Sequence, residues 1–165
     1  MKDNIVLIGM MGCGKSTVGK LLAKAIGFTF VDTDEEIEAA VGRSIPRIFA
    51  EEGESFFRDW ELGIAEELAG RKGLVIACGG GLPTRCDSIG ALKYSGTVVF
   101  LHRDPGEIYD RVSMRNRPLG QGGRADFLAR YAQREPLYRS WAEHEVEVQP
   151  TPGETAGKIL EVLEL

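Results

Sequence analysis

Short runs of apolar residues alternate along this chain with longer stretches of mixed polarity. Residues 5–8, 74–78 and 97–101 are almost wholly apolar, which is typical of short strands buried on both faces. Residues 28–32 predict another strand, which ends in a carboxylate, and residues 146–148 predict a weak last strand. The hydrophobic pattern therefore predicts five strands.

Helical spacing of apolar residues fills the intervals between these strands. Gly27 and Gly42 are expected to end the first two helices, and Ser44 is expected to cap the third, with Pro46 in its first turn. The predicted helices are 17–26, 34–41, one that opens at 44–46, 54–68, 105–114, 125–141 and 154–163.

Strands that alternate with helices predict an α/β protein of three layers, with a five-stranded parallel sheet and helices on both faces. Ligands of such sheets bind beyond the carboxyl ends of the strands. We therefore expect the residues that follow Ile8, Val31, Cys78 and Leu101 to converge on one site.

Composition narrows the class of protein. A length of 165 residues fits a single domain over 1–165, and 43% hydrophobic with 27% charged residues is typical of a globular protein. The net charge of −5 argues against nucleic acid or an anionic membrane as the main partner, and no apolar run is long enough to span a bilayer.

The cysteines and the start of the chain bear on its location. Cys13, Cys78 and Cys86 lack the spacing of metal ligands, which favours free thiols in a reducing cytoplasm. The chain enters its first predicted strand almost at once, so no signal or transit peptide is expected. The prediction is a cytoplasmic protein.

Residues 9–16 read Gly-Met-Met-Gly-Cys-Gly-Lys-Ser, which is the G-x-x-x-x-G-K-S pattern of a phosphate-binding P-loop. Its glycines let backbone N–H groups turn toward phosphate oxygens, and the following helix adds its positive end. Lys15 is expected to reach the β- and γ-phosphates, and Ser16 to bind Mg²⁺. The alternative, a chance glycine-rich turn, is disfavoured by the strand before it and the helix after it. The sequence thus predicts binding of a nucleoside triphosphate.

Two carboxylates, Asp32 and Asp34, follow the second predicted strand. One can hold Mg²⁺, directly or through water, and the other can accept hydrogen bonds from the hydroxyls of an acceptor and take its proton. The alternative is that an acid here only serves the following helix, which Thr33 or Asp34 could cap.

Arg58 and Glu61 are three residues apart in a predicted helix and share a face, so Glu61 can orient the guanidinium for bidentate binding of a carboxylate. The alternative is an ordinary surface ion pair. Residues 79–81 are three glycines at the end of a strand, which indicates a backbone close to a ligand, with a flexible loop as the alternative.

Basic residues gather around the glycine-rich segment 117–124, which has the composition of a mobile flap over phosphates. Arg117 and Arg134 are singled out as ligand contacts, whereas about half of the cluster is expected to face water. The two histidines, His102 and His144, have no metal-ligand pattern. The cluster comprises Arg111, Arg115, Arg117, Arg124, Arg130, Arg134 and Arg139.

These motifs together resemble the shikimate kinases. The P-loop is followed in order by D-T-D, F-R-x-x-E, G-G-G, R-P-L and R-x-P-L-Y, from about residue 5 to residue 138. The resemblance implies a fold like that of nucleoside monophosphate kinases and transfer of the γ-phosphoryl group of ATP to the 3-hydroxyl of shikimate. It also implies a monomer, with Mg²⁺ as cofactor, ATP as co-substrate and a product used for chorismate and aromatic amino acids.

The resemblance also implies roles for single residues. Lys15 would stabilise the transferred charge, Ser16 would bind Mg²⁺, and Asp32 would lie near the metal through water. Asp34 would bind the ring hydroxyls as general base, and Arg117 would fold over the phosphates as part of a lid at about 112–124. The residues expected to contact ATP are Gly12, Cys13, Gly14, Lys15, Ser16, Thr17 and Arg117; those expected to contact shikimate, largely from a segment at about 33–61, are Asp34, Arg58, Gly80 and Arg134.

Two other functions remain open from the sequence. A related small-molecule kinase, such as a gluconate kinase, would share the P-loop and lid but not the pair F-R-x-x-E and R-x-P-L-Y. A non-catalytic nucleotide-binding relative would be expected to lose Lys15, the acidic pair or the lid arginine, and all of these are present.

Overall fold

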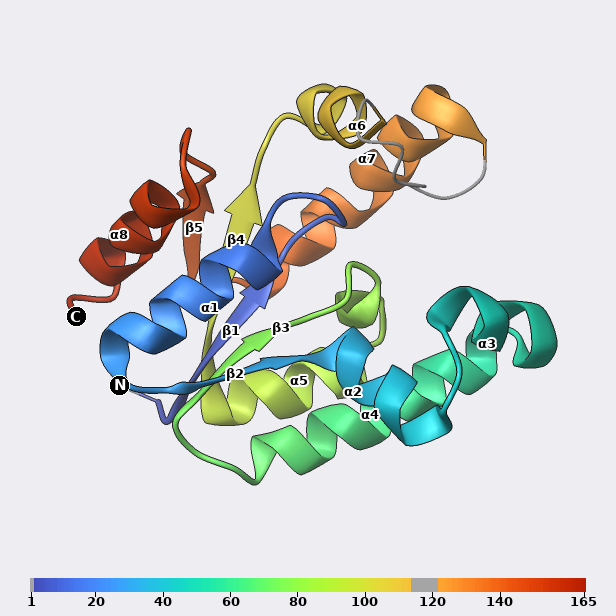
Figure 1. The fold of residues 1–165 in the computed structure, drawn as a ribbon, viewed down its shortest axis with the longest axis horizontal. Coiled ribbons are helices and arrows are strands. Elements are labelled where there is room, and N and C mark those ends of the chain that lie inside the picture. Colours follow the sequence, from blue (N-terminus) through green and yellow to red (C-terminus); the bar gives the residue numbers. More distant parts are fainter. Residues whose placement is uncertain (1, 114–121) are drawn as a thin grey trace.

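The computed structural model of the protein describes residues 2–113 and 122–165, arranged as strands and helices that alternate along the chain (Figure 1). The strands are β1 (Asn4–Ile8), β2 (Thr29–Asp32), β3 (Leu74–Ala77), β4 (Gly96–His102) and β5 (His144–Glu147). The helices are α1 (Lys15–Ile26), α2 (Thr33–Val41), α3 (Ile45–Glu52), α4 (Glu54–Ala69), the 3₁₀ turn η1 (Leu82–Thr84), α5 (Cys86–Ser95), α6 (Pro105–Ser113), α7 (Gly123–Trp141) and α8 (Pro152–Val162).

The five strands form one parallel sheet in the order β2-β3-β1-β4-β5. The central strand β1 places Val6 between Ile76 of β3 and Val98 of β4. All carboxyl ends meet at one edge because every pair is parallel. The predicted five-stranded parallel sheet is confirmed, and its carboxyl edge is where the segments after β1, β2 and β3 come together.

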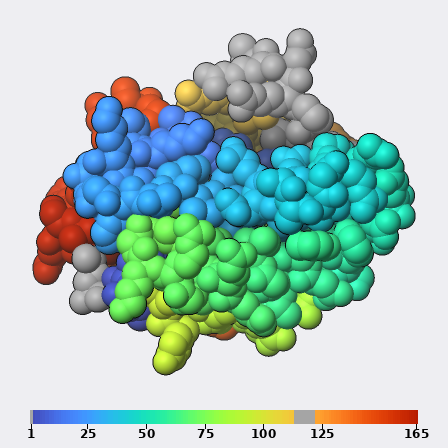
Figure 2. Space-filling model, turned by 60° about the horizontal axis from the view of Figure 1, so that its bottom comes forward, coloured from blue at the N-terminus to red at the C-terminus, as the bar shows by residue number. Residues whose placement is uncertain are grey.

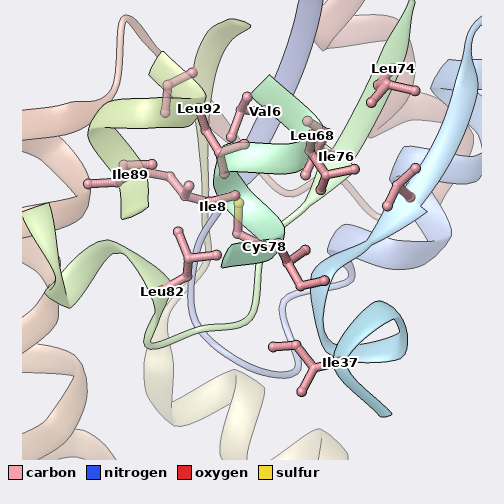
Figure 3. Packing of buried hydrophobic residues seen from close by; sticks show 14 of the residues in the cluster. Val6, Ile8, Ile37, Leu68, Leu74, Ile76, Cys78, Leu82, Ile89 and Leu92 are labelled. Atoms are coloured by element: carbon pink, nitrogen blue, oxygen red, sulfur yellow. The ribbon is translucent and has the colours of Figure 1, made fainter. Parts of the chain in front are cut away.

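Each central strand contributes to two hydrophobic cores. Val6 and Ile8 face the helices α4 and α5, whereas Ile5 and Leu7 face α1 and α8, because successive side chains of a strand point to opposite faces. Figure 1 shows α1 and α8 on one side of the sheet and α4 and α5 on the other. Figure 3 shows the α4–α5 core, where side chains of β1 and β3 pack together with Leu82, Ile89 and Leu92. The three layers predicted from the apolar runs are therefore present.

Local signals set most of the helix boundaries. Gly27 and Gly42 end α1 and α2 with φ of 74° and 76°, a left-handed conformation that favours glycine. The Ser44 hydroxyl accepts a hydrogen bond from the Arg47 N–H at the start of α3. These predicted ends are confirmed. Helix α2 is capped by Asp32, so the alternative in which an acid serves this helix holds for Asp32, whereas Thr33 and Asp34, the caps considered, do not cap it.

The segment between β3 and β4 carries two elements that the hydrophobic pattern did not predict, η1 and α5. Only Ile89 and Leu92 of α5 are fully buried apolar side chains, so its helical periodicity is weak in the sequence. Packing against α4 and the sheet stabilises it instead.

On the molecular surface, the cyan segment with α2 and α3 lies along the green helix α4 (Figure 2). Within residues 2–113 and 122–165, no helix is both long and apolar enough to cross a membrane.

Candidate active site

The P-loop joins β1 to α1 at the carboxyl edge of the sheet. Gly12 and Gly14 have φ of 87° and 97°, so the predicted glycine turn is present, and α1 begins directly at Lys15. The Lys15 ammonium is buried and donates to the carbonyl oxygens of Gly9 at 2.8 Å and Met10 at 3.0 Å. An ammonium group inside a loop at a helix N-terminus forms a positive site suited to phosphate.

The other predicted phosphate contacts lie on the same loop and on the first turn of α1. Cys13 is buried, and its Sγ lies 3.7 Å from the Lys15 Nζ. It packs in the core on the α1 side, as expected of a small residue at a variable P-loop position. Thr17 is exposed, so its side chain is accessible to a ligand.

Ser16 and Asp32 meet where α1 faces the end of β2. The Ser16 hydroxyl donates to Asp32 Oδ2 at 2.7 Å, and Asp32 Oδ1 accepts from the N–H groups of Asp34 and Glu35. A hydroxyl and a carboxylate side by side are the oxygen donors that Mg²⁺ takes, and Mg²⁺ keeps several waters and phosphate oxygens as further ligands. Among the described residues, no three His, Cys, Asp or Glu side chains lie together as a group that could hold a metal ion.

Asp34 is the first of the residues predicted to bind the acceptor, which is the compound that receives the phosphoryl group. We call the part of the site formed by Asp34, Arg58, Gly80 and Arg134 the acceptor side. It follows the cap of α2 and is partly buried. Burial first and the nearby Asp32 carboxylate second raise its pKa to about 6, while Lys15 and Arg58 oppose the shift. A carboxyl with a pKa near neutrality is suited to accept a proton and release it again.

Arg58, which is partly buried, and Glu61, which is buried, form a pair on α4, so the alternative of an ordinary surface ion pair is wrong. Arg58 Nη1 donates to Glu61 Oε1 at 2.6 Å; the side chains are 14% and 1% exposed. Glu54 accepts from Arg58 at 3.3 Å on the other side of the guanidinium. Burial raises the pKa of Glu61 to about 7, against the influence of Arg58, and Glu61 Oε2 has no partner among the described residues.

Gly79, Gly80 and Gly81 lie between the predicted acceptor-side residues. A Cβ on Gly79 would overlap the Asp34 carboxylate, and a Cβ on Gly81 would overlap the Arg58 guanidinium. A Cβ on Gly80 would lie 3.2 Å from the Met11 nitrogen and 3.6 Å from Arg134 Nη1. The overlaps at Gly79 and Gly81 and the tight contact at Gly80 show that α2, α4, α7 and the P-loop surround one short segment without side chains.

The glycine segment is not a loose loop. The Gly79 N–H donates to the buried Thr33 hydroxyl at 2.9 Å, and the Gly79 carbonyl accepts from the Leu82 N–H at 3.0 Å. Tyr138 donates its hydroxyl to the Gly80 carbonyl oxygen at 2.6 Å. The segment is therefore held from α2, from η1 and from α7.

The structure describes only part of the predicted basic cluster. Arg134 is partly buried next to Gly80, whereas Arg124 and Arg139 pair with surface carboxylates on Asp110 and Glu135. Arg117, and with it most of the predicted lid at 112–124, lies outside the described residues.

Sequence reasoning missed three contributors to the site, and each has a detectable signal. Thr33 is the middle residue of the motif D-T-D, and Tyr138 is the last residue of the motif R-x-P-L-Y. Only the charged residues of these two motifs were predicted to contact a ligand. Glu54 stands four residues before Arg58, the spacing of a helical ion pair.

The sequence of the chain is similar to that of a known protein family. The chain matches the family model described as shikimate kinase over residues 11–164. It is 40% identical to the shikimate kinase of Cupriavidus pinatubonensis, covering 99% of this chain and 88% of the relative. It is 42% identical to that of Pseudomonas entomophila, covering 98% and 94%.

Solved structures agree with the sequence relatives. The shikimate kinase from Acinetobacter baumannii in complex with shikimate has a TM-score of 0.91 and 39% identity, covering 99% of this chain and 94% of that chain. A gluconokinase from Sinorhizobium meliloti covers 99% of this chain but has 22% identity and a TM-score of 0.57, a likeness of fold alone. With a family model and relatives that both span nearly its full length, the chain belongs to the shikimate kinase family.

Proposed function

We propose that the protein transfers the γ-phosphoryl group of ATP to the 3-hydroxyl of shikimate, giving shikimate 3-phosphate and ADP for the synthesis of chorismate and aromatic amino acids. The observation that carries the proposal is the meeting of Asp34, Arg58 and Arg134 around residues 79–81, next to the P-loop. Two arginines and one carboxylate match an acceptor with one carboxylate and several hydroxyls.

The P-loop side binds the nucleotide. Backbone N–H groups of residues 12–17 and the N-terminus of α1 face the phosphates, and the Lys15 ammonium exchanges the carbonyl oxygens of Gly9 and Met10 for phosphate oxygens. Ser16 would hold Mg²⁺, and Asp32 would lie near it through water. When bound, Mg²⁺ neutralises charge on the phosphate oxygens.

The other side binds the acceptor. Arg58, oriented by the buried Glu61, and Arg134 hold the shikimate carboxylate, and the backbone at Gly80 contacts the ring. Asp34 accepts hydrogen bonds from ring hydroxyls, which places the 3-hydroxyl toward the P-loop. Its raised pKa supports a role as general base.

In the transfer step, the 3-hydroxyl oxygen forms a bond to the γ-phosphorus, and the bond from that phosphorus to the bridging β,γ-oxygen breaks. The electron pair of the broken bond leaves with ADP, and the hydroxyl proton passes to Asp34. Lys15 stabilises the negative charge that develops on the transferred group. We assign Arg117 the same task from a lid at about 112–124, within a single domain of residues 1–165 whose acceptor-binding segment is about 33–61.

A coupled assay of ADP release tests the proposal. Purified protein with Mg²⁺ and ATP is expected to turn over with shikimate and to show only background hydrolysis with gluconate. Activity with gluconate but not shikimate would identify the other kinase class. ATP binding without turnover on either acid would identify a non-catalytic relative.

Two further properties are part of the proposal. We expect a monomer, because the site draws all of its assigned residues from one chain, and light scattering measures this directly. We also expect a cytoplasmic protein, because free Cys13, Cys78 and Cys86 suit a reducing compartment. Fractionation of the source cells checks the location.

A further inference from the structure

Tyr138 lies on the inner face of α7, four residues after Arg134, so the two side chains share one face of the helix. Its side chain is completely buried. The ring packs against Phe100 of β4, with 5.2 Å between the ring centroids. The phenol is thereby held at a fixed place under the glycine segment.

The Tyr138 hydroxyl touches two parts of the site at once. It lies 2.6 Å from the Gly80 carbonyl oxygen, to which it donates, and 3.7 Å from the Met10 sulfur in the P-loop. Burial raises the pKa of Tyr138 to about 12, while the neighbouring Arg134 guanidinium opposes the shift. The phenol consequently stays protonated and remains a donor at any pH at which the enzyme is assayed.

This hydrogen bond sets the direction of one peptide group. None of the described peptide bonds is cis, so the Gly81 N–H points to the side opposite the Gly80 carbonyl, away from Tyr138. Neither the Gly80 nor the Gly81 N–H donates to any residue in the described part of the chain. Gly80 is partly exposed and Gly81 is buried, and in that part of the chain neither N–H has a protein acceptor that a ligand would have to displace.

We propose that Tyr138 is a positioning residue for the acceptor: its hydroxyl fixes the Gly80–Gly81 peptide so that the backbone presents its N–H groups between Asp34, Arg58 and Arg134. The proposal rests on the proposed function, since the acceptor is taken to be shikimate. Two adjacent glycines have no side chains to restrict rotation of the peptide between them. Without the hydroxyl, the partly buried Gly80 carbonyl has no partner among the described residues, and the peptide rotates to find one.

The first test is Tyr138→Phe, which removes one oxygen and keeps the ring against Phe100. The KM for shikimate is expected to rise about tenfold, because a buried acceptor is left unpaired, while the KM for ATP stays within about twofold. Equal rises in both KM values, or no rise for shikimate, would overturn the proposal.

Tyr131→Phe is the matched control. Tyr131 lies on the same helix, is 6% exposed, and its hydroxyl donates to none of the described residues. All kinetic parameters of this variant are expected to stay within about twofold of the wild type. Thermal unfolding of both variants shows whether a kinetic effect is only a loss of fold.

A second readout does not depend on the identity of the acceptor. In ¹⁵N-glycine-labelled protein without ligands, Tyr138→Phe is expected to shift the amide resonances of Gly80 and Gly81, whereas Tyr131→Phe is not. Unchanged Gly80 and Gly81 resonances would overturn the role of Tyr138 even in an active enzyme. Shifted resonances in a protein that does not phosphorylate shikimate would instead count against the proposed function.

Discussion

The two sides of the site are built in different ways. The P-loop is a run of adjacent residues, and its buried ammonium bonds to carbonyls only five and six residues away. The acceptor side takes Asp34 from α2, Arg58 from α4 and Arg134 from α7, and residues 79–81 join them. Phosphate recognition is thus a local property of a loop, whereas acceptor recognition depends on how the whole sheet brings distant segments to one edge.

The two sides also differ in electrostatics. The acceptor side holds two carboxyl groups, Asp34 and Glu61, whose pKa values burial raises to about 6 and about 7. Each costs free energy of folding when it is ionised, and Glu61 Oε2 has no partner among the described residues. Such a cost is typical of groups retained for function rather than for stability. Four substitutions or titrations test this contrast, from the largest expected effect to the smallest.

Asp34→Asn should have the largest effect. The amide cannot accept the hydroxyl proton, so kcat is expected to fall about a thousandfold, while the Kd for ATP stays within about twofold. Steady-state kinetics and ATP titration measure the two effects separately. Wild-type turnover in this variant would remove Asp34 from its role as base.

Arg58→Ala should act on the acceptor alone. Loss of a buried, charge-assisted pair is expected to raise the KM for shikimate about a hundredfold, with little change in the KM for ATP. Arg47→Ala is the control, because Arg47 is 63% exposed and its one ion pair within the described part of the chain is with Glu51 on the surface. If the KM values for both substrates rise together, the two sides of the site are not separable.

Gly79→Ala tests the close approach of the glycine segment. The added methyl group would overlap the Asp34 carboxylate, so kcat is expected to fall on the order of tenfold or more as Asp34 is displaced. Gly63→Ala is the control: Gly63 lies within α4 with open space at its Cβ position, and alanine there should stabilise the protein by about 0.5–1 kcal/mol. Full activity of Gly79→Ala would show that the segment and Asp34 are not in contact.

The pH dependence of stability should show the smallest effect. Asp34 and Glu61 have folded-state pKa values above their unfolded values, so the folded state binds more protons as pH falls through the folded-state values. The free energy of unfolding is therefore expected to rise between pH 7.5 and pH 5.5. Asp34→Asn should flatten this rise and add about 1–2 kcal/mol at pH 7.5, measured by urea denaturation. A variant less stable than wild type at both pH values would contradict the cost assigned to the buried charge.

Much of the fold could be read from the sequence because its signals are local. Strands buried on both faces need continuous apolar runs, and Gly27, Gly42 and Ser44 mark helix ends through their own backbone and hydroxyl chemistry. The P-loop belongs to the same class, since its spacing alone predicts the glycine turn and the place of Lys15. Helix α5 could not be read this way, because its burial comes from α4 and the sheet rather than from a strong pattern of its own.

The residues of the acceptor side could be predicted from the sequence, but their burial and contacts could not. The motifs named Asp34, Arg58, Gly80 and Arg134 as candidates, but nothing in their spacing could show that Arg58 and Glu61 are buried or that Asp32 caps α2. Burial raises the pKa of Asp34, and burial is a property of every segment packed around a side chain. For the same reason the contact between Tyr138 and the Gly80 carbonyl, 58 positions apart in the chain, exists only in the folded protein. The amino-acid sequence alone determines which side chains each motif contains, whereas the distances between residues far apart in the chain are set when the helices pack on the sheet.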